Sequence, residues 1–208
     1  MRKIPTLFER EYVNGKSVGV IPTVKPGLEW VLNGEGYATL KADGSCCRVV
    51  DGVVYKRYDA KKGKKPPEGA IPCQPEPDPV TGHWPHWLKC DPDNPADKWF
   101  ISALMFHNEW VAPCFSDRTY EAIGPHFNGN PYHLANDTLY LHGSILLTTV
   151  PRTFEGIREY LESHEIEGIV FWKDDEPRCK IKRSDFGLQW PVDDPDFHLM
   201  LLAGGGRQ

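Results

Sequence analysis

The sequence has no apolar run that approaches the roughly 18 residues needed to cross a membrane. Its first residues contain no apolar core typical of a secretory signal peptide, and none of its six cysteines form a CxxC pair. With a net charge of −5, the chain also lacks the overall positive charge that attracts polyanions. Together these absences predict a reduced, cytoplasmic protein that has free thiols and no membrane contact. Nothing in the sequence indicates an obligate protein partner.

Glycine and proline are abundant instead, with 19 of each among the 208 residues, which favours strands, turns and long loops over a helical bundle. Residues 60–98 are rich in proline, lysine and aspartate and show little periodicity, so we expect a long surface insertion there. We expect one domain over residues 1–192, followed by a C-terminal tail over 193–208.

Strand patterns dominate the rest of the chain after a turn-rich start over residues 1–36. The runs CCRVV and VVYKR are joined by Asp51-Gly52, a pair typical of two-residue hairpins. One helix is predicted, over 153–164, with Thr153 at its start and apolar residues at helical spacing. The pattern predicts an α+β fold of mostly antiparallel sheet with few helices. Further strands are expected at 99–106, 109–113, 118–124, 139–150, 168–172 and 179–182.

Two short segments are strongly basic although the whole chain is acidic. Residues 56–65, KRYDAKKGKK, carry six basic groups and one acid, and residues 178–183, RCKIKR, carry four basic groups and none. Such clusters can contact phosphates, but they are also typical of solvated surface, and the sequence leaves both readings open.

Four other segments each combine charged residues with a strand end or a glycine turn: KADG (41–44), YEAIG (120–124), EGIV (167–170) and KIK (180–182). In KIK, the strand period of two puts both lysines on one face. Such a set suits nucleotidyl transfer, in which a neutral lysine attacks an α-phosphate. Carboxylates hold a divalent metal, and further lysines neutralise the phosphate charge.

In this order, the four segments resemble motifs I, III, IV and V of the covalent nucleotidyltransferases, which include DNA ligases, RNA ligases and mRNA capping enzymes. Longer segments resemble the vertebrate-type 5′-to-3′ RNA ligase family and its bacterial and phage relatives, from about residue 35 to 192. These are KADGSCCRV, GHWPHW, IGPHFNGNPY, LYLHG, IEGIVF and FGLQWP.

The resemblance implies an antiparallel-sheet-rich adenylation domain of the ATP-grasp-like ligase type, without an OB domain. It also implies ATP as substrate, Mg²⁺ or Mn²⁺, and RNA with 5′-phosphate and 3′-hydroxyl ends. Lys41 matches the nucleophile that forms lysine–AMP, and Asp43 orients the pocket. Glu167 matches a metal ligand, and Glu121 a residue near the ribose or metal.

The resemblance further implies that Lys180 and Lys182 bind the α-phosphate and that Arg57 lies near the ribose or a substrate phosphate. His142 falls where related RNA ligases carry an aromatic residue stacked on adenine. RNA contact would come from the basic segment, through Arg57, Lys61, Lys62, Lys64 and Lys65.

The sequence departs from the family pattern at the residue directly before the nucleophile, where it has Leu40 and many relatives have a glutamate. It bears on the choice of base rather than on the covalent chemistry. Two other functions fit the same residues: a nucleotidyltransferase that acts on DNA or with another NTP, and a catalytically silent RNA-binding module.

Other polar groups favour structural roles. Cys73, His83, His86 and Cys90 fit no standard zinc-finger spacing, so we do not expect a zinc site there. The turn at 128–131 either only ends a strand or shapes the pocket beside Glu121, and the first is favoured.

Overall fold

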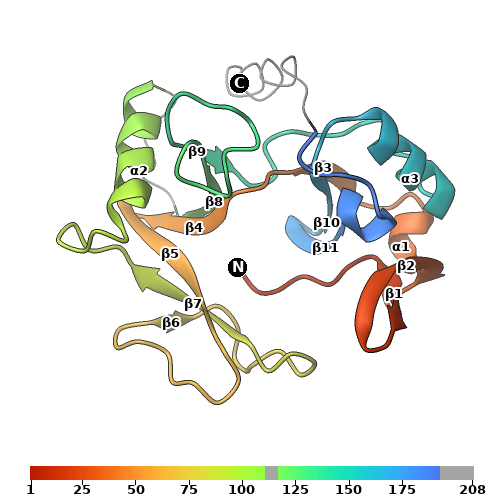
Figure 1. Ribbon diagram of the computed structural model, residues 1–208, viewed down its shortest axis with the longest axis horizontal. Coiled ribbons are helices and arrows are strands. Elements are labelled where there is room, and N and C mark those ends of the chain that lie inside the picture. Colours follow the sequence, from red (N-terminus) through yellow and green to blue (C-terminus); the bar gives the residue numbers. More distant parts are fainter. Residues whose placement is uncertain (111–116, 193–208) are drawn as a thin grey trace. The chain divides into compact units, whose positions relative to one another are not determined.

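The computed structural model describes residues 1–110 and 117–192 (Figure 1). The chain forms two compact units, here called unit 1 and unit 2. Among the described residues, unit 1 comprises Met1–Lys3 and Asp43–His142, and unit 2 comprises Ile4–Ala42 and residues 143–192. The chain thus leaves unit 2 between Lys41 and Asp43 and returns to it after His142. The single domain expected over 1–192 stays a prediction.

Unit 1 is built on a six-stranded antiparallel sheet in the order β6-β7-β5-β4-β8-β9. The β4–β5 hairpin turns at Asp51 and Gly52, which both have positive φ, at 49° and 75°. This is the geometry that a two-residue Asp-Gly turn favours, and it confirms the predicted hairpin. The strands are β4 (Ser45–Val50), β5 (Val53–Ala60), β6 (Ile71–Pro72), β7 (Trp84–Lys89), β8 (Arg118–Ile123) and β9 (Thr138–Leu141).

Helix α2 (Lys98–Trp110) packs on one face of this sheet. Its buried residues include Ala103, Leu104 and His107, at the spacing of one helical face. They join a core with Cys47, Val49, Tyr120 and Leu139 from the sheet. This face of the sheet is therefore apolar, and the alternate residues of β4 and β8 point to the other face.

Unit 2 holds a three-stranded antiparallel sheet in the order β11-β10-β3. Its strands are β3 (Tyr37–Lys41), β10 (Gly168–Lys173) and β11 (Glu176–Lys182). Helix α3 (Phe154–Ser163) confirms the predicted helix, and the hydroxyl of Thr153 accepts a hydrogen bond from the Gly156 amide at its start. Unit 2 also contains α1 (Glu29–Leu32) and the 3₁₀ helix η1 (Arg183–Phe186).

The expected α+β class, with antiparallel sheets and few helices, is confirmed, but some of the local predictions differ from the structure. Residues 99–106 form helix α2 instead of a strand, because an apolar run alone does not separate a buried strand from a buried helix. Residues 1–36 contain the hairpin of β1 (Phe8–Val13) and β2 (Lys16–Val24) around Asn14-Gly15. Both strands are largely exposed and show no clear alternation, which hid them in the sequence.

Within residues 60–98, where we expected a surface insertion with little regular structure, WPHWLK forms β7 and pairs with both β5 and β6. Strand 118–124 is confirmed as β8, and those at 168–172 and 179–182 as β10 and β11. The strand expected at 139–150 ends at Leu141, and the one expected at 109–113 lies partly in α2 and partly outside the described residues. Across the described residues, no helix is long and apolar enough to span a membrane.

Candidate functional site

The register of the unit 2 sheet brings three of the proposed site lysines to one face. Lys41, the last residue of β3, pairs with Gly168, and Gly168 also pairs with Lys182 on β11. Lys180 lies two residues before Lys182 and pairs with Val170. Because directly paired residues share a face and alternate residues of a strand do too, these lysines stand on the same side of the sheet.

The carboxylate of Glu167 joins two of these lysines. One oxygen contacts Nζ of Lys41, and the other lies 3.4 Å from Nζ of Lys182. The Glu167 side chain is only 6% exposed, whereas those of Lys41 and Lys182 are 20% and 33% exposed. A buried carboxylate is expensive unless it is paired, so the two cations account for its burial. We call Lys41, Glu167, Lys180 and Lys182 the lysine face.

The opposite face of the same sheet is apolar and buried. Leu40 is 6% exposed, and Ile169 and Ile181 are fully buried. Leu40 therefore points away from the lysine face, into the core of unit 2. The residue that departs from the family pattern here has a packing role.

In unit 1, two residues from the 125–133 loop hold the Asp-Gly part of the KADG segment. The Asp43 amide donates to the Tyr132 hydroxyl at 2.6 Å, and Nδ2 of Asn128 donates to Oδ1 of Asp43 at 2.9 Å. Asn128 also donates to the Gly44 carbonyl at 2.7 Å. The turn at 128–131 thus orients Asp43, a more specific role than the simple strand end that the sequence favoured.

Gly44 is needed for close packing. A Cβ at this position would lie 2.2 Å from the carbonyl oxygen of Ala122 and 3.0 Å from Cγ of Glu121. The glycine lets the start of β4 approach β8, on which Glu121 stands.

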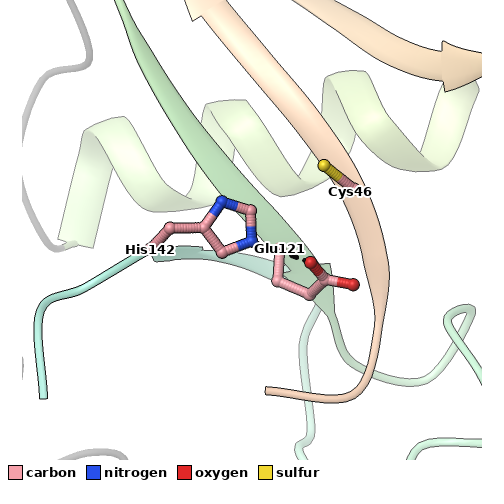
Figure 2. Close-up of side chains that lie close together, drawn as sticks. All are labelled: Cys46, Glu121 and His142. Carbon is pink, nitrogen blue, oxygen red and sulfur yellow. Dashed lines mark hydrogen bonds and ion pairs between the residues drawn. The ribbon is translucent and has the colours of Figure 1, made fainter. Parts of the chain in front are cut away.

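A second polar group lies on the sheet face of unit 1 that does not contact α2. Cys46 on β4 pairs directly with Glu121 on β8, so the two side chains share that face. The main-chain amide of His142, just past β9, donates to the carbonyl oxygen of Thr119, two residues before Glu121. Figure 2 shows Cys46, Glu121 and His142 gathered there. We call these three residues the Cys-Glu-His cluster.

Hydrogen bonds fix the imidazole of His142 at both nitrogens. Its Nε2 lies 2.8 Å from Oε2 of Glu121, and its Nδ1 lies 3.1 Å from the Thr119 hydroxyl. The side chains of His142 and Glu121 are 14% and 13% exposed. The ring orientation is therefore set by contacts within the protein.

Burial, together with the negative charge of Glu121, raises the pKa of the Cys46 thiol to about 12. At neutral pH the thiol therefore keeps its proton and is no nucleophile by itself. The five described cysteines are all free thiols.

Arg57 extends the polar face of the unit 1 sheet. It lies on β5, where Lys56 pairs with Cys47 of β4, so Arg57 comes opposite Cys46. Its Nε donates to Asp59 at 2.9 Å. Burial by itself would lower the pKa of Arg57, but the hydrogen bond and charge of Asp59 outweigh this and raise it, so the group stays cationic.

Unit 1 also contains the other lysines proposed to contact RNA, and the cysteines and histidines at which the sequence predicted no zinc site. Lys61, Lys62, Lys64 and Lys65 are all exposed in the loop between β5 and β6. Among the described residues, one group of three or more histidine, cysteine, aspartate or glutamate side chains has all its possible ligand atoms within 4.8 Å of one another. This group is the Cys-Glu-His cluster. Cys73, His83, His86 and Cys90 form no such group.

The structure thus brings the proposed residues together in two sets. Unit 2 holds the lysine face, and unit 1 holds Asp43, Arg57, Glu121 and His142. Strand alternation predicts one of Cys46 and Cys47 in the core and the other near the pocket, but only the β4–β8 register shows that Cys46 is the neighbour of Glu121. Sequence reasoning missed Tyr132, although the segment IGPHFNGNPY gave a signal there.

Comparison with known proteins relates this chain to RNA ligases. A family model described as RNA ligase 1 matches residues 111–200. RNA ligase 1 of Danio rerio is 30% identical over 141 aligned residues, covering 54% of this chain. The chain spans 43% of that protein's length. RNA ligase 1 of Pongo abelii is 27% identical, and the alignment covers 75% of this chain and 69% of that protein. RNA ligase 1 of Rattus norvegicus is 28% identical, and the alignment covers 76% of this chain and 69% of that protein.

Proposed function

We propose that this chain is an ATP-dependent RNA ligase of the covalent nucleotidyltransferase superfamily, acting in the cytoplasm. The observation that carries the proposal is the contact of Lys41 with Glu167, beside Lys182, on one sheet face. The similarity to RNA ligase 1 proteins supports RNA as the nucleic acid.

In the first step, Nζ of Lys41 attacks the α-phosphate of ATP. Its ammonium form first loses one proton to solvent, because only the neutral amine is nucleophilic. The N–P bond then forms, the P–O bond to pyrophosphate breaks, and the nitrogen releases a second proton to solvent. Glu167 orients Nζ before the attack, since its carboxylate contacts that amine. Lys180 and Lys182 neutralise charge that grows on the phosphate oxygens.

The AMP then passes to the 5′-phosphate of an RNA end, which regenerates Lys41. In the last step, a 3′-hydroxyl attacks the activated phosphate, AMP leaves, and a phosphodiester bond joins the ends. Both later steps are again phosphoryl transfers that depend on positioning and on charge stabilisation.

The donor set of the lysine face fits a hard divalent cation, because Glu167 offers carboxylate oxygens and Mg²⁺ or Mn²⁺ takes its other ligands from phosphate and water. Glu167 would hold the ion. When bound, the ion supplies positive charge to the phosphate oxygens.

To residues of unit 1 we assign contacts with nucleotide and with RNA. Asp43, oriented by Tyr132 and Asn128, shapes the start of the pocket. Glu121 and Arg57 contact the ribose or a phosphate, and the fixed ring of His142 stacks on adenine. RNA phosphates meet the exposed basic segment, formed by Lys61, Lys62, Lys64 and Lys65.

The test is intact mass after incubation with ATP and Mg²⁺, starting from protein treated with pyrophosphate to remove any AMP already attached. We expect a gain of one AMP, and transfer of that AMP to RNA with a 5′-phosphate. Lys41→Arg is the decisive variant, since guanidinium keeps a cation beside Glu167 but does not act as a nucleophile.

The matched control is Lys173→Arg. Lys173 is another lysine of this sheet that pairs with a glutamate, at 2.6 Å from Glu35, and it lies outside the proposed site. AMP labelling that survives in folded Lys41→Arg protein contradicts the nucleophile assignment. Labelling only by GTP, or sealing only of DNA, indicates the nucleotidyltransferase alternative. Salt-sensitive RNA binding without labelling by any NTP indicates the binding module.

A further inference from the structure

The Cys-Glu-His cluster combines a thiol, a carboxylate and an imidazole on one sheet face. Each of its three residues offers one ligand atom, and these atoms lie within 4.8 Å of one another. In a tetrahedral zinc site, ligand atoms are separated by about 3.5 Å, as follows from metal–ligand bonds of roughly 2.0–2.3 Å. Small side-chain rotations would therefore bring the three atoms to ligand positions (Figure 2).

We propose that Cys46, Glu121 and His142 form a binding site for a borderline divalent transition metal, with Zn²⁺ as the best match. Sulfur, imidazole nitrogen and carboxylate oxygen are the three ligand types that zinc uses in proteins. Three protein ligands leave a fourth position for water or a substrate oxygen. This site differs from the Mg²⁺ or Mn²⁺ site proposed above, because a thiolate does not suit those harder ions.

The cluster is supported by rigid neighbours. Cys46 and Glu121 are fixed by direct pairing of β4 and β8, and His142 by its main-chain bond to Thr119. The Thr119 hydroxyl, 3.1 Å from Nδ1 of His142, supplies the outer hydrogen bond that metal-binding histidines normally have. Strands hold ligand geometry better than loops do.

The proton balance of binding can be written from the same contacts. In the tautomer with a proton on Nε2, His142 donates to Glu121 across the 2.8 Å contact. On binding, the ring takes the tautomer with its proton on Nδ1, which donates a hydrogen bond to the Thr119 hydroxyl, and Nε2 gives its lone pair to the metal. The Cys46 thiol releases one proton to solvent as the metal–sulfur bond forms.

Metal binding here does not depend on the proposed ligase activity, so the test needs no ATP or RNA. The chelator-treated full chain is titrated with Co²⁺, whose thiolate charge-transfer and tetrahedral d–d absorption report a sulfur-containing site directly. We expect one equivalent of Co²⁺ to give both bands and Zn²⁺ to displace it.

Cys46→Ala is expected to abolish the charge-transfer band, and His142→Gln to weaken Zn²⁺ binding at least tenfold. Cys73→Ala is the matched control, since Cys73 is another part-buried free cysteine of unit 1, and it should keep the band. Thr119→Val should weaken binding by about 10- to 100-fold, as loss of an outer hydrogen bond does. Circular dichroism checks that each variant folds.

The proposal is overturned if the wild-type chain gives no charge-transfer band, or if the band survives in Cys46→Ala. It is also overturned if Zn²⁺ binds folded His142→Gln as tightly as the wild-type chain. These results leave the AMP-transfer test untouched, because that test is made with Mg²⁺ and its own variants.

Discussion

Lys41 lies directly opposite Gly168 in the antiparallel pair of β3 and β10. Glu167 comes one residue before Gly168, and its carboxylate contacts Nζ of Lys41. Because Gly168 also pairs with Lys182, one glycine is flanked on both sides by lysines of the lysine face. The nucleophile candidate is thus fixed by strand register, and by a carboxylate from the residue just before β10.

Gly168→Ala should disturb this arrangement. A Cβ there would lie 2.3 Å from the Ile181 carbonyl oxygen and 3.0 Å from Cα of Lys182, so β11 must move. Overpacking of this kind costs about 1–3 kcal/mol of unfolding free energy. We expect lower thermal stability and a loss of AMP labelling, measured by calorimetry and intact mass. Wild-type stability and labelling would contradict the close packing described here.

Glu167→Gln keeps the shape of the side chain but removes the charge that faces Lys41 and Lys182. We expect AMP labelling to slow by about 10²- to 10³-fold, the usual effect of losing one charged group at a reacting centre. Glu165→Gln, two residues earlier in unit 2, is the control and should label at the wild-type rate. Equal labelling rates in both variants would remove Glu167 from the proposed mechanism.

Tyr132→Phe tests whether the 125–133 loop positions Asp43. The variant removes the hydroxyl that accepts from the Asp43 amide, at a cost of about 1–3 kcal/mol for a buried donor that loses its partner. We expect slower AMP labelling, by roughly tenfold, in a protein that still folds. Tyr12→Phe is the control, since Tyr12 is 62% exposed on β1. An unchanged labelling rate in Tyr132→Phe would leave the loop with a packing role only.

His107 should make stability depend on pH. Burial lowers the pKa of His107 in α2 below its ordinary value of 6.5. From about pH 6.5 down to the folded pKa, the unfolded chain binds a proton that the folded protein does not. The free energy of unfolding therefore falls as pH decreases through this window, by at most about 1.4 kcal/mol per pH unit for one group.

Denaturant unfolding at a series of pH values checks this. His107→Gln does not titrate, so its stability should fall less steeply below pH 6.5 than that of the wild-type chain. Identical slopes for the two proteins would show that His107 contributes nothing to the pH dependence.

If both proposals hold, Zn²⁺ should slow AMP transfer. Glu121 and His142 are proposed nucleotide-binding residues, and a bound metal would hold them in the Cys-Glu-His cluster. We expect micromolar Zn²⁺ to inhibit labelling at fixed Mg²⁺ and Cys46→Ala to resist the inhibition. Equal Zn²⁺ sensitivity in the variant and the wild-type chain would separate the metal site from the nucleotide site.

The sequence by itself determined the chemistry-bearing residues and their order. KADG, EGIV and KIK are local patterns, and period-two alternation already put Lys180 and Lys182 on one face. The Asp51-Gly52 hairpin and the helix that begins after Thr153 were also readable, because turn and capping preferences act over a few residues.

Only the tertiary structure decided which of these residues meet. The contact of Lys41 with Glu167 spans 126 positions, and the pairing of Cys46 with Glu121 depends on the register of β4 and β8. Likewise, residues 99–106 became a helix because their apolar side chains pack on a sheet as one helical face. Such outcomes depend on packing between distant segments, which local preference does not encode.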